Sequence, residues 1–97
     1  MSYRIEFSED AEKVVKKWKK SNPNSFKKLY KLLPELAEHP RTGTGHPEAL
    51  KGGNDITYSR RLSGQDRIIY DIYDDVVTVL VLELEGHYND KYKDGVL

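Results

Sequence analysis

The chain has 97 residues, of which 37% are hydrophobic and 33% charged, and this predicts one globular domain over residues 1–97 with a modest core. Cysteine is absent, which excludes disulfide bonds and thiolate metal sites. No apolar run has the length of a membrane span, and the first residues lack the apolar segment of a signal peptide. We therefore expect a cytoplasmic protein with no membrane partner.

Sixteen basic residues balance sixteen acidic ones, and this zero net charge argues against tight non-specific binding to nucleic acid. The distribution is uneven, because eight lysines lie in residues 13–31 with no acidic residue among them. Acidic residues gather instead in residues 71–75 and 83–94. We expect one basic flank, which either only solvates the helices or follows the phosphates of RNA.

The first part of the chain predicts a strand and two helices. Residues 3–7 alternate between apolar and polar side chains, as in a strand with one buried face. Ser8 can cap the helix that follows, and Pro23 suits the first turn of a second helix. Pro34 should kink that second helix or restart it as a final turn. The apolar stripes at helical spacing are Ala11, Val14, Val15 and Trp18, then Phe26, Leu29, Tyr30, Leu33 and Leu36.

The remainder predicts a loop and an antiparallel sheet. Prolines and glycines in residues 40–47 leave little room for regular structure. Residues 57–62, 67–73 and 76–83 have strand character, and the short links between them suit hairpins. The fold class is therefore α+β, with two N-terminal helices packed on one face of a small, mainly antiparallel sheet. We expect residues 89–97 to be weakly ordered.

The tripeptide Gly86-His87-Tyr88 directly follows the most apolar strand. The ordinary pKa of histidine lies near neutral pH, so His87 is either a general acid or base or a plain surface residue. Tyr88 either stacks on an unpaired RNA base or packs as a half-buried ring. His39 and His46 each precede a proline and suit turns, and histidines without metal-ligand spacing do not predict a metal site.

Charged residues in the sheet region form a second set of candidates. Glu48 is either a solvated carboxylate or a base close to the loop. Arg60 and Arg61 are adjacent in a predicted strand and must point to opposite faces of the sheet. At most one of them shares a face with Arg67, and the other is solvated or faces the helices. Lys51 completes the basic set.

Five motifs occur in a specific order: Gly45-His46-Pro47-Glu48-Ala49-Leu50-Lys51, Tyr58-Ser59-Arg60-Arg61-Leu62, Asp66-Arg67-Ile68-Ile69-Tyr70, Asp74-Asp75 and Gly86-His87-Tyr88. In this order they resemble the YoeB/Txe branch of the RelE/ParE toxin superfamily, whose members belong to type II toxin–antitoxin systems. The resemblance extends over residues 8–88 and is strongest from Gly45 onward.

The resemblance implies an endoribonuclease that cleaves messenger RNA in the A site of the 70S ribosome and is silenced by a cognate YefM-like antitoxin. By this resemblance Glu48 would be the general base and Arg67 would stabilise the phosphate. His87 would be the general acid, with Tyr88 as its aromatic neighbour in the catalytic site. Lys51, Arg61 and Arg60 would be RNA-binding residues. The implied reaction requires no metal or other cofactor, and the sequence leaves open whether two copies form a homodimer.

In the implied reaction the base takes the proton of a ribose 2′-OH, which attacks the adjacent phosphorus. The products are a 2′,3′-cyclic phosphate and a 5′-hydroxyl. The chain also departs from the family pattern. Its last strand is longer, so only an even insertion or a β-bulge keeps His87 on the catalytic face. Glu83 and Glu85 precede the histidine and would repel RNA.

Two other functions remain open at this point. The first is a toxin of the same scaffold that binds a protein target, such as a topoisomerase, without cleaving RNA. The second is a degenerate module that only pairs with its antitoxin and represses their shared promoter. The set of Glu48, Arg67, His87 and Tyr88 argues against the first, because a pure binding protein does not need it. The acidic approach to His87 favours the second.

Overall fold

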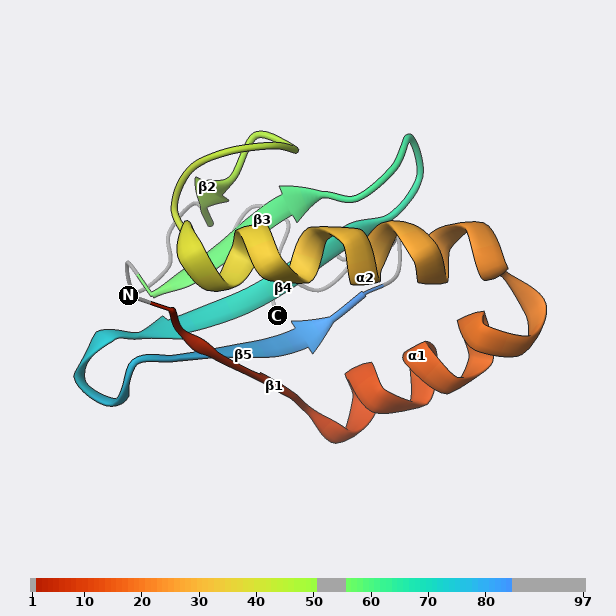
Figure 1. Cartoon of the computed structure of the whole chain (residues 1–97), viewed down its shortest axis with the longest axis horizontal. Coiled ribbons are helices and arrows are strands. Elements are labelled where there is room, and N and C mark those ends of the chain that lie inside the picture. The colour runs from red at the N-terminus through yellow and green to blue at the C-terminus, as the bar shows by residue number, and fades with distance from the viewer. Residues whose placement is uncertain (1, 51–55, 85–97) are drawn as a thin grey trace.

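The computed structural model describes residues 2–50 and 56–84, in which two helices lie across a five-stranded sheet (Figure 1). In chain order the elements are β1 (Arg4–Phe7), α1 (Glu9–Ser21), α2 (Pro23–Glu38), β2 (Glu48–Ala49), β3 (Thr57–Arg61), β4 (Arg67–Tyr73), a 3₁₀ turn (Asp74–Val76) and β5 (Thr78–Glu83). The α+β class expected from the sequence is confirmed. Among the described residues, neither helix combines the length and the apolarity that a membrane crossing requires.

Side-chain caps start both helices where the sequence predicts. The hydroxyl of Ser8 accepts a hydrogen bond from the backbone N–H of Ala11, and the side chain of Asn22 does the same for Ser25. Helix α2 then continues through Pro34 to Glu38, so of the two predicted outcomes, a kink or a restart, the restart does not occur. Pro34 is exposed, and water can therefore solvate the carbonyl that loses its N–H partner.

The sheet order is β1-β5-β4-β3-β2, and β1 runs parallel to β5 while the other pairs are antiparallel. The sequence predicted the three C-terminal strands as a sequential antiparallel set, which is confirmed. It did not predict the two-residue strand β2. The last strand was expected from residue 76 but begins at Thr78, because the 3₁₀ turn and Val77, with φ 48°, close the link after β4.

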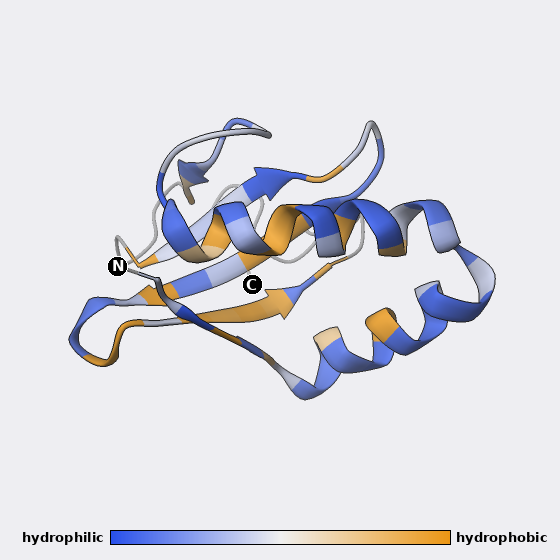
Figure 2. Ribbon diagram, viewed as in Figure 1, coloured by the Kyte–Doolittle hydropathy of each residue, from blue (hydrophilic) through white to orange (hydrophobic). Residues whose placement is uncertain are grey.

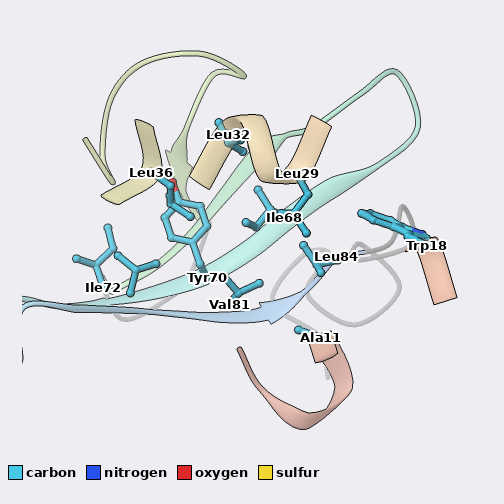
Figure 3. Packing of buried hydrophobic residues seen from close by; sticks show 11 residues of the cluster. Ala11, Trp18, Leu29, Leu32, Leu36, Ile68, Tyr70, Ile72, Val81 and Leu84 are labelled. Carbon is cyan, nitrogen blue, oxygen red and sulfur yellow. The ribbon is translucent and has the colours of Figure 1, made fainter. Parts of the chain in front are cut away.

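The core lies between the helices and one face of the sheet: both layers carry hydrophobic residues (Figure 2), and their side chains meet there (Figure 3). Leu29, Leu36 and Tyr70 are completely buried at its centre, and Trp18 packs near one end of the cluster. The predicted stripe of α2 needs one correction. Tyr30 is 51% exposed, and Leu32 takes the core position instead, since it lies one turn from Leu29 and Leu36.

Candidate functional site

The face of the sheet opposite the helices contains most of the described site residues. Ile68 and Tyr70 of β4 point into the core, so the alternating residues Arg67 and Ile69 point to the other face, here called the open face. The cross-strand register extends this assignment to neighbouring strands. One row across the open face consists of Glu48, Ser59, Ile69 and Glu83, of which Ser59 and Ile69 are buried, and the next row contains the pair Arg61 and Arg67.

Glu48 and Arg67 are therefore close enough to act on one group. They lie two strands apart and one row apart, which corresponds to roughly 12 Å between their Cα atoms. Glu48 and Arg61 are exposed and Arg67 is half-buried. Long side chains at this spacing can converge on a single phosphodiester placed between them. A carboxylate can accept a proton there, and guanidinium groups can bind the phosphate oxygens.

A β-bulge in β5 affects the same face. The pairing passes from Tyr70–Val81 directly to Ile69–Glu83, so Leu82 is an extra residue on β5. The bulge returns Glu83 to the open face and Leu84 to the core, where Leu84 is fully buried. A bulge was one of the two conditions under which we expect His87 to stay on the catalytic face. His87, Tyr88 and Lys51 lie outside the described residues.

Arg60 lies on the helix face and is completely buried. One guanidinium nitrogen forms an ion pair with Glu35 at 2.9 Å, and the other donates to the carbonyls of His39 and Thr42 at 2.7 and 2.9 Å. A buried guanidinium with these partners has no surface to offer to a nucleic acid. The expectation that Arg60 binds RNA is therefore corrected, because it is the helix-facing member of the arginine pair.

Glu35 and Thr44 were not among the candidates from the sequence. Thr44 donates to the Glu35 carboxylate through both its backbone N–H and its hydroxyl, each at 2.6 Å. These two bonds, helped by the charge of Arg60, hold the pKa of Glu35 below its usual range. The signal that could have indicated the contact is Gly43-Thr44-Gly45, a segment in which both glycines have positive φ and the chain can approach other groups closely.

A second polar cluster lies on the open face beside the row of Glu48. Asp71 accepts hydrogen bonds from the hydroxyls of Thr57 and Tyr73. The bond to Asp71 is the main reason that the pKa of Tyr73 lies above its usual range. Each carboxylate oxygen of Asp71 accepts one of these bonds, so this cluster stabilises the pairing of β3 and β4.

The lysines of the helices are exposed, and two of them, on α2, lie beside the end of β3. A shallow groove between α2 and the end of β3 is lined by Lys28, Lys31 and Arg61 together with Leu32, Glu35, Thr44 and Leu62. The basic flank predicted from the sequence thus extends to Arg61. Within the described part of the chain, no group of three or more histidine and acidic side chains is placed to hold a metal ion.

The arrangement of two helices over one face of a five-stranded sheet is shared with small toxins of bacterial toxin–antitoxin systems. Residues 7–88 match the model of the YoeB-like toxin of the bacterial type II toxin–antitoxin system. The match covers most of the sequence, and the chain belongs to this family.

Individual proteins agree with this assignment. Toxin YoeB of Streptomyces coelicolor is 29% identical over 85 residues, which cover 88% of this chain and 99% of that toxin. The structure of the YoeB dimer from Staphylococcus aureus aligns with a TM-score of 0.78 at 27% identity and covers 91% of this chain and 100% of that one. The YoeB–YefM complex from the same organism aligns with a TM-score of 0.73 at 27% identity, with the same coverage.

Proposed function

We propose that this chain is a ribosome-dependent endoribonuclease, which cleaves messenger RNA bound to the 70S ribosome and acts as the toxin of its module. The single observation that supports this most is the shared open face of Glu48, Arg61 and Arg67 in adjacent rows of the sheet. A toxin that only binds a protein target has no need for a carboxylate and two guanidinium groups at this spacing. Family membership supports the same activity.

The proposed reaction begins with Glu48, whose carboxylate takes the proton of the ribose 2′-OH. The freed oxygen attacks the adjacent phosphorus, and the P–O5′ bond breaks. Arg67 neutralises the charge that grows on the non-bridging oxygens, while His87 in its protonated form gives its proton to the leaving 5′ oxygen. The products are a 2′,3′-cyclic phosphate and a 5′-hydroxyl. These residues supply every proton transfer and the charge neutralisation, so the reaction needs no metal.

Recognition of RNA would involve more of the surface. Tyr88 would stack on a base next to the cleaved bond, and Lys51 and Arg61 would bind phosphates beside it. The groove that contains Lys28 and Lys31 would continue the basic track from Arg61 along α2. Such contacts place the message without reading its sequence, which fits a substrate that the ribosome already presents.

The proposed partner in the resting cell is a YefM-like antitoxin. A YoeB–YefM complex and a YoeB dimer are both known from Staphylococcus aureus for chains that match this one over their whole length. Homodimer formation is therefore part of the proposal. An antitoxin segment that orders on binding would cover the toxin and silence it.

A second candidate function is the degenerate module that pairs with its antitoxin without cleaving RNA. Glu83 favours it, because this carboxylate shares a row of the open face with Glu48. Among residues 2–50 and 56–84, the buried Oε2 of Glu83 and the buried Oγ of Ser59 have no hydrogen-bond partner. A carboxylate there would repel phosphate and lower the affinity for RNA.

The test uses purified 70S ribosomes programmed with a defined message. We expect the wild-type chain to produce discrete cuts with 2′,3′-cyclic phosphate ends, and Glu48→Gln, Arg67→Ala and His87→Gln each to lower the rate by about 10²–10⁴-fold. Melting temperature serves as the control for folding. Growth arrest without cuts would favour a binding toxin. Absence of both cuts and arrest would favour the degenerate module.

A further inference from the structure

We infer that Arg60 and Glu35 form a buried clamp that holds residues 39–46, here called the 39–46 loop, and thereby positions Glu48 for catalysis. This inference rests on the proposed function, since it assigns Glu48 as the base. Arg60 and Glu35 are positioning residues, because neither lies on the open face. Their effect on the reaction would pass through the backbone of the loop and of β2.

The first step of the argument concerns the partners of Arg60. Its guanidinium donates to Glu35 of α2, to the carbonyl of His39 at the end of α2 and to the carbonyl of Thr42 within the loop. Tyr70 reinforces the same point from β4, since its hydroxyl donates to the carbonyl of Pro40 at 2.7 Å. Burial is the main cause that raises the pKa of Tyr70, and the hydroxyl therefore stays protonated and can donate this bond.

Glu35 holds the loop at a later point. Its carboxylate accepts the backbone N–H and the hydroxyl of Thr44, so the ion pair and the loop share one carboxylate. The two side chains therefore bind the loop at successive positions: His39 and Thr42 through Arg60, and Thr44 through Glu35. A segment without regular structure is fixed in this way by charge-assisted hydrogen bonds.

The fit between loop and clamp is close. Gly43 has φ 107°, and a Cβ at this position would collide with the Glu35 carboxylate. Gly45 has φ 85°, and a Cβ there would collide with the carbonyl of Arg61 and lie 2.8 Å from Cγ of Arg60. The backbone of the loop thus rests directly on the ion pair and on the strand that contains Arg60.

The loop leads straight to the proposed base. The carbonyl of Gly45 accepts a hydrogen bond from the N–H of Arg61 at 2.8 Å. Three residues later Glu48, in β2, pairs with Ser59 of β3. Strand β2 has only two residues and lies at the edge of the sheet, so its own pairing gives little rigidity. The anchored loop then adds to the restraint that this pairing and the hydrogen bond from the N–H of Leu50 to the carbonyl of Thr57 place on Glu48. In β3, Arg60 belongs to the clamp on one face while its neighbour Ser59 pairs with Glu48.

The expected consequence for catalysis follows from distance. A general base must lie within hydrogen-bond reach of the proton it takes, and a displacement of about 1 Å can lower the rate by about 10²-fold. Loss of the clamp should therefore lower kcat more than it weakens binding of the message, because the charged groups of Arg61, Lys28 and Lys31 remain to bind phosphate, although Glu35 and Thr44 line the same groove.

The experiment measures kcat, KM and melting temperature for Glu35→Gln, Arg60→Lys and Thr44→Val. We expect each to lower kcat about tenfold or more, with KM changed less than about threefold. Thr44 is exposed, so Thr44→Val removes one bond to Glu35 without disturbing the core and remains informative if the other two variants fail to fold. The matched control is Asp74→Asn, which breaks the exposed ion pair of Asp74 with Arg41 of the same loop and should leave kcat unchanged.

A double-mutant cycle separates positioning from a general loss of structure. In a Glu48→Gln background there is no base left to position, so Thr44→Val and Glu35→Gln should cause no further loss of kcat. An equal fractional loss in both backgrounds, or normal kcat in the clamp variants, would overturn the inference while leaving the proposed nuclease intact. Full activity of Glu48→Gln itself would overturn both.

Discussion

Arg60 and Arg61 are neighbours in β3, yet their surroundings have little in common. Arg60 points toward the helices, is completely buried and binds Glu35 and two backbone carbonyls. Arg61 is exposed, pairs with Arg67 across the strands and lines the groove beside α2. The comparison separates two uses of one residue type: inside the fold the guanidinium of Arg60 fixes the backbone, and on the open face the side chain of Arg61 is exposed to solvent.

The same contrast holds for the two faces of the whole sheet. The helix-covered face consists mainly of completely buried apolar residues such as Ile68, Tyr70 and Val81. The open face holds Glu48, Arg67 and the hydrogen-bonded carboxylate of Asp71. Substitutions on the first face should therefore affect mainly stability, and those of the charged residues on the second mainly activity, whereas Ser59 and Ile69 on the second face are themselves buried.

The largest expected effect is that of Arg60→Ala. This substitution leaves Glu35 and the carbonyls of the loop without their buried donor, and we expect the free energy of unfolding to fall by about 3 kcal/mol. Urea denaturation followed by circular dichroism measures it. Arg61→Ala is the control one residue away, and its stability should stay within about 0.5 kcal/mol of wild type. Equal losses in both variants would contradict the different placement of the two side chains.

An intermediate effect is expected for Arg61→Ala on RNA. Loss of one phosphate contact should weaken binding about tenfold and reduce the slope of log affinity against log salt by about 1. Binding of a short message fragment across a series of salt concentrations measures both quantities. Thr78→Ala, distant from the groove on β5, supplies a neutral comparison. An unchanged salt slope would remove Arg61 from the RNA-binding residues.

The smallest effect concerns acid pH. The bonds from Thr44 lower the pKa of Glu35 in the folded chain, so this group contributes stability above the pKa of an unfolded glutamate, about 4.3. The contribution is lost as pH falls from there through the lower folded pKa. The free energy of unfolding, measured at pH values from about 3 to about 6, should fall less steeply with decreasing pH in Glu35→Gln than in wild type. Equal slopes would mean that Glu35 titrates as it does in the unfolded chain.

Much of the fold could be predicted from local patterns. The stripe with Leu29 and Leu36 and the caps at Ser8 and Asn22 are short-range features, because they depend on helical spacing and on a side chain that reaches its own backbone. Period-two patterns likewise indicated the last three strands. Tyr30 shows the limit of this reasoning, since an apolar ring at helical spacing still lies outside the core.

Part of the site could also be predicted. Alternation along a strand required Arg60 and Arg61 to point in opposite directions, and the structure agrees. The alternation did not tell which of the two arginines faces the helices, because that depends on the pairing of Arg60 with Ile68 and on the position of Glu35 of α2. The motif resemblance indicated Glu48 and Arg67, while the roles of Glu35 and Thr44 needed coordinates.

By itself the sequence determined the two helices, the first strand and the last three strands, their order and the residues able to move a proton or bind a phosphate, since these follow from side-chain chemistry and local periodicity. Only the tertiary structure decided the parallel pairing of β1 with β5, the bulge at Leu82 and the burial of Arg60. Each of these depends on contacts between segments far apart in the chain. Such contacts form only when the helices and the sheet bury their apolar faces against each other.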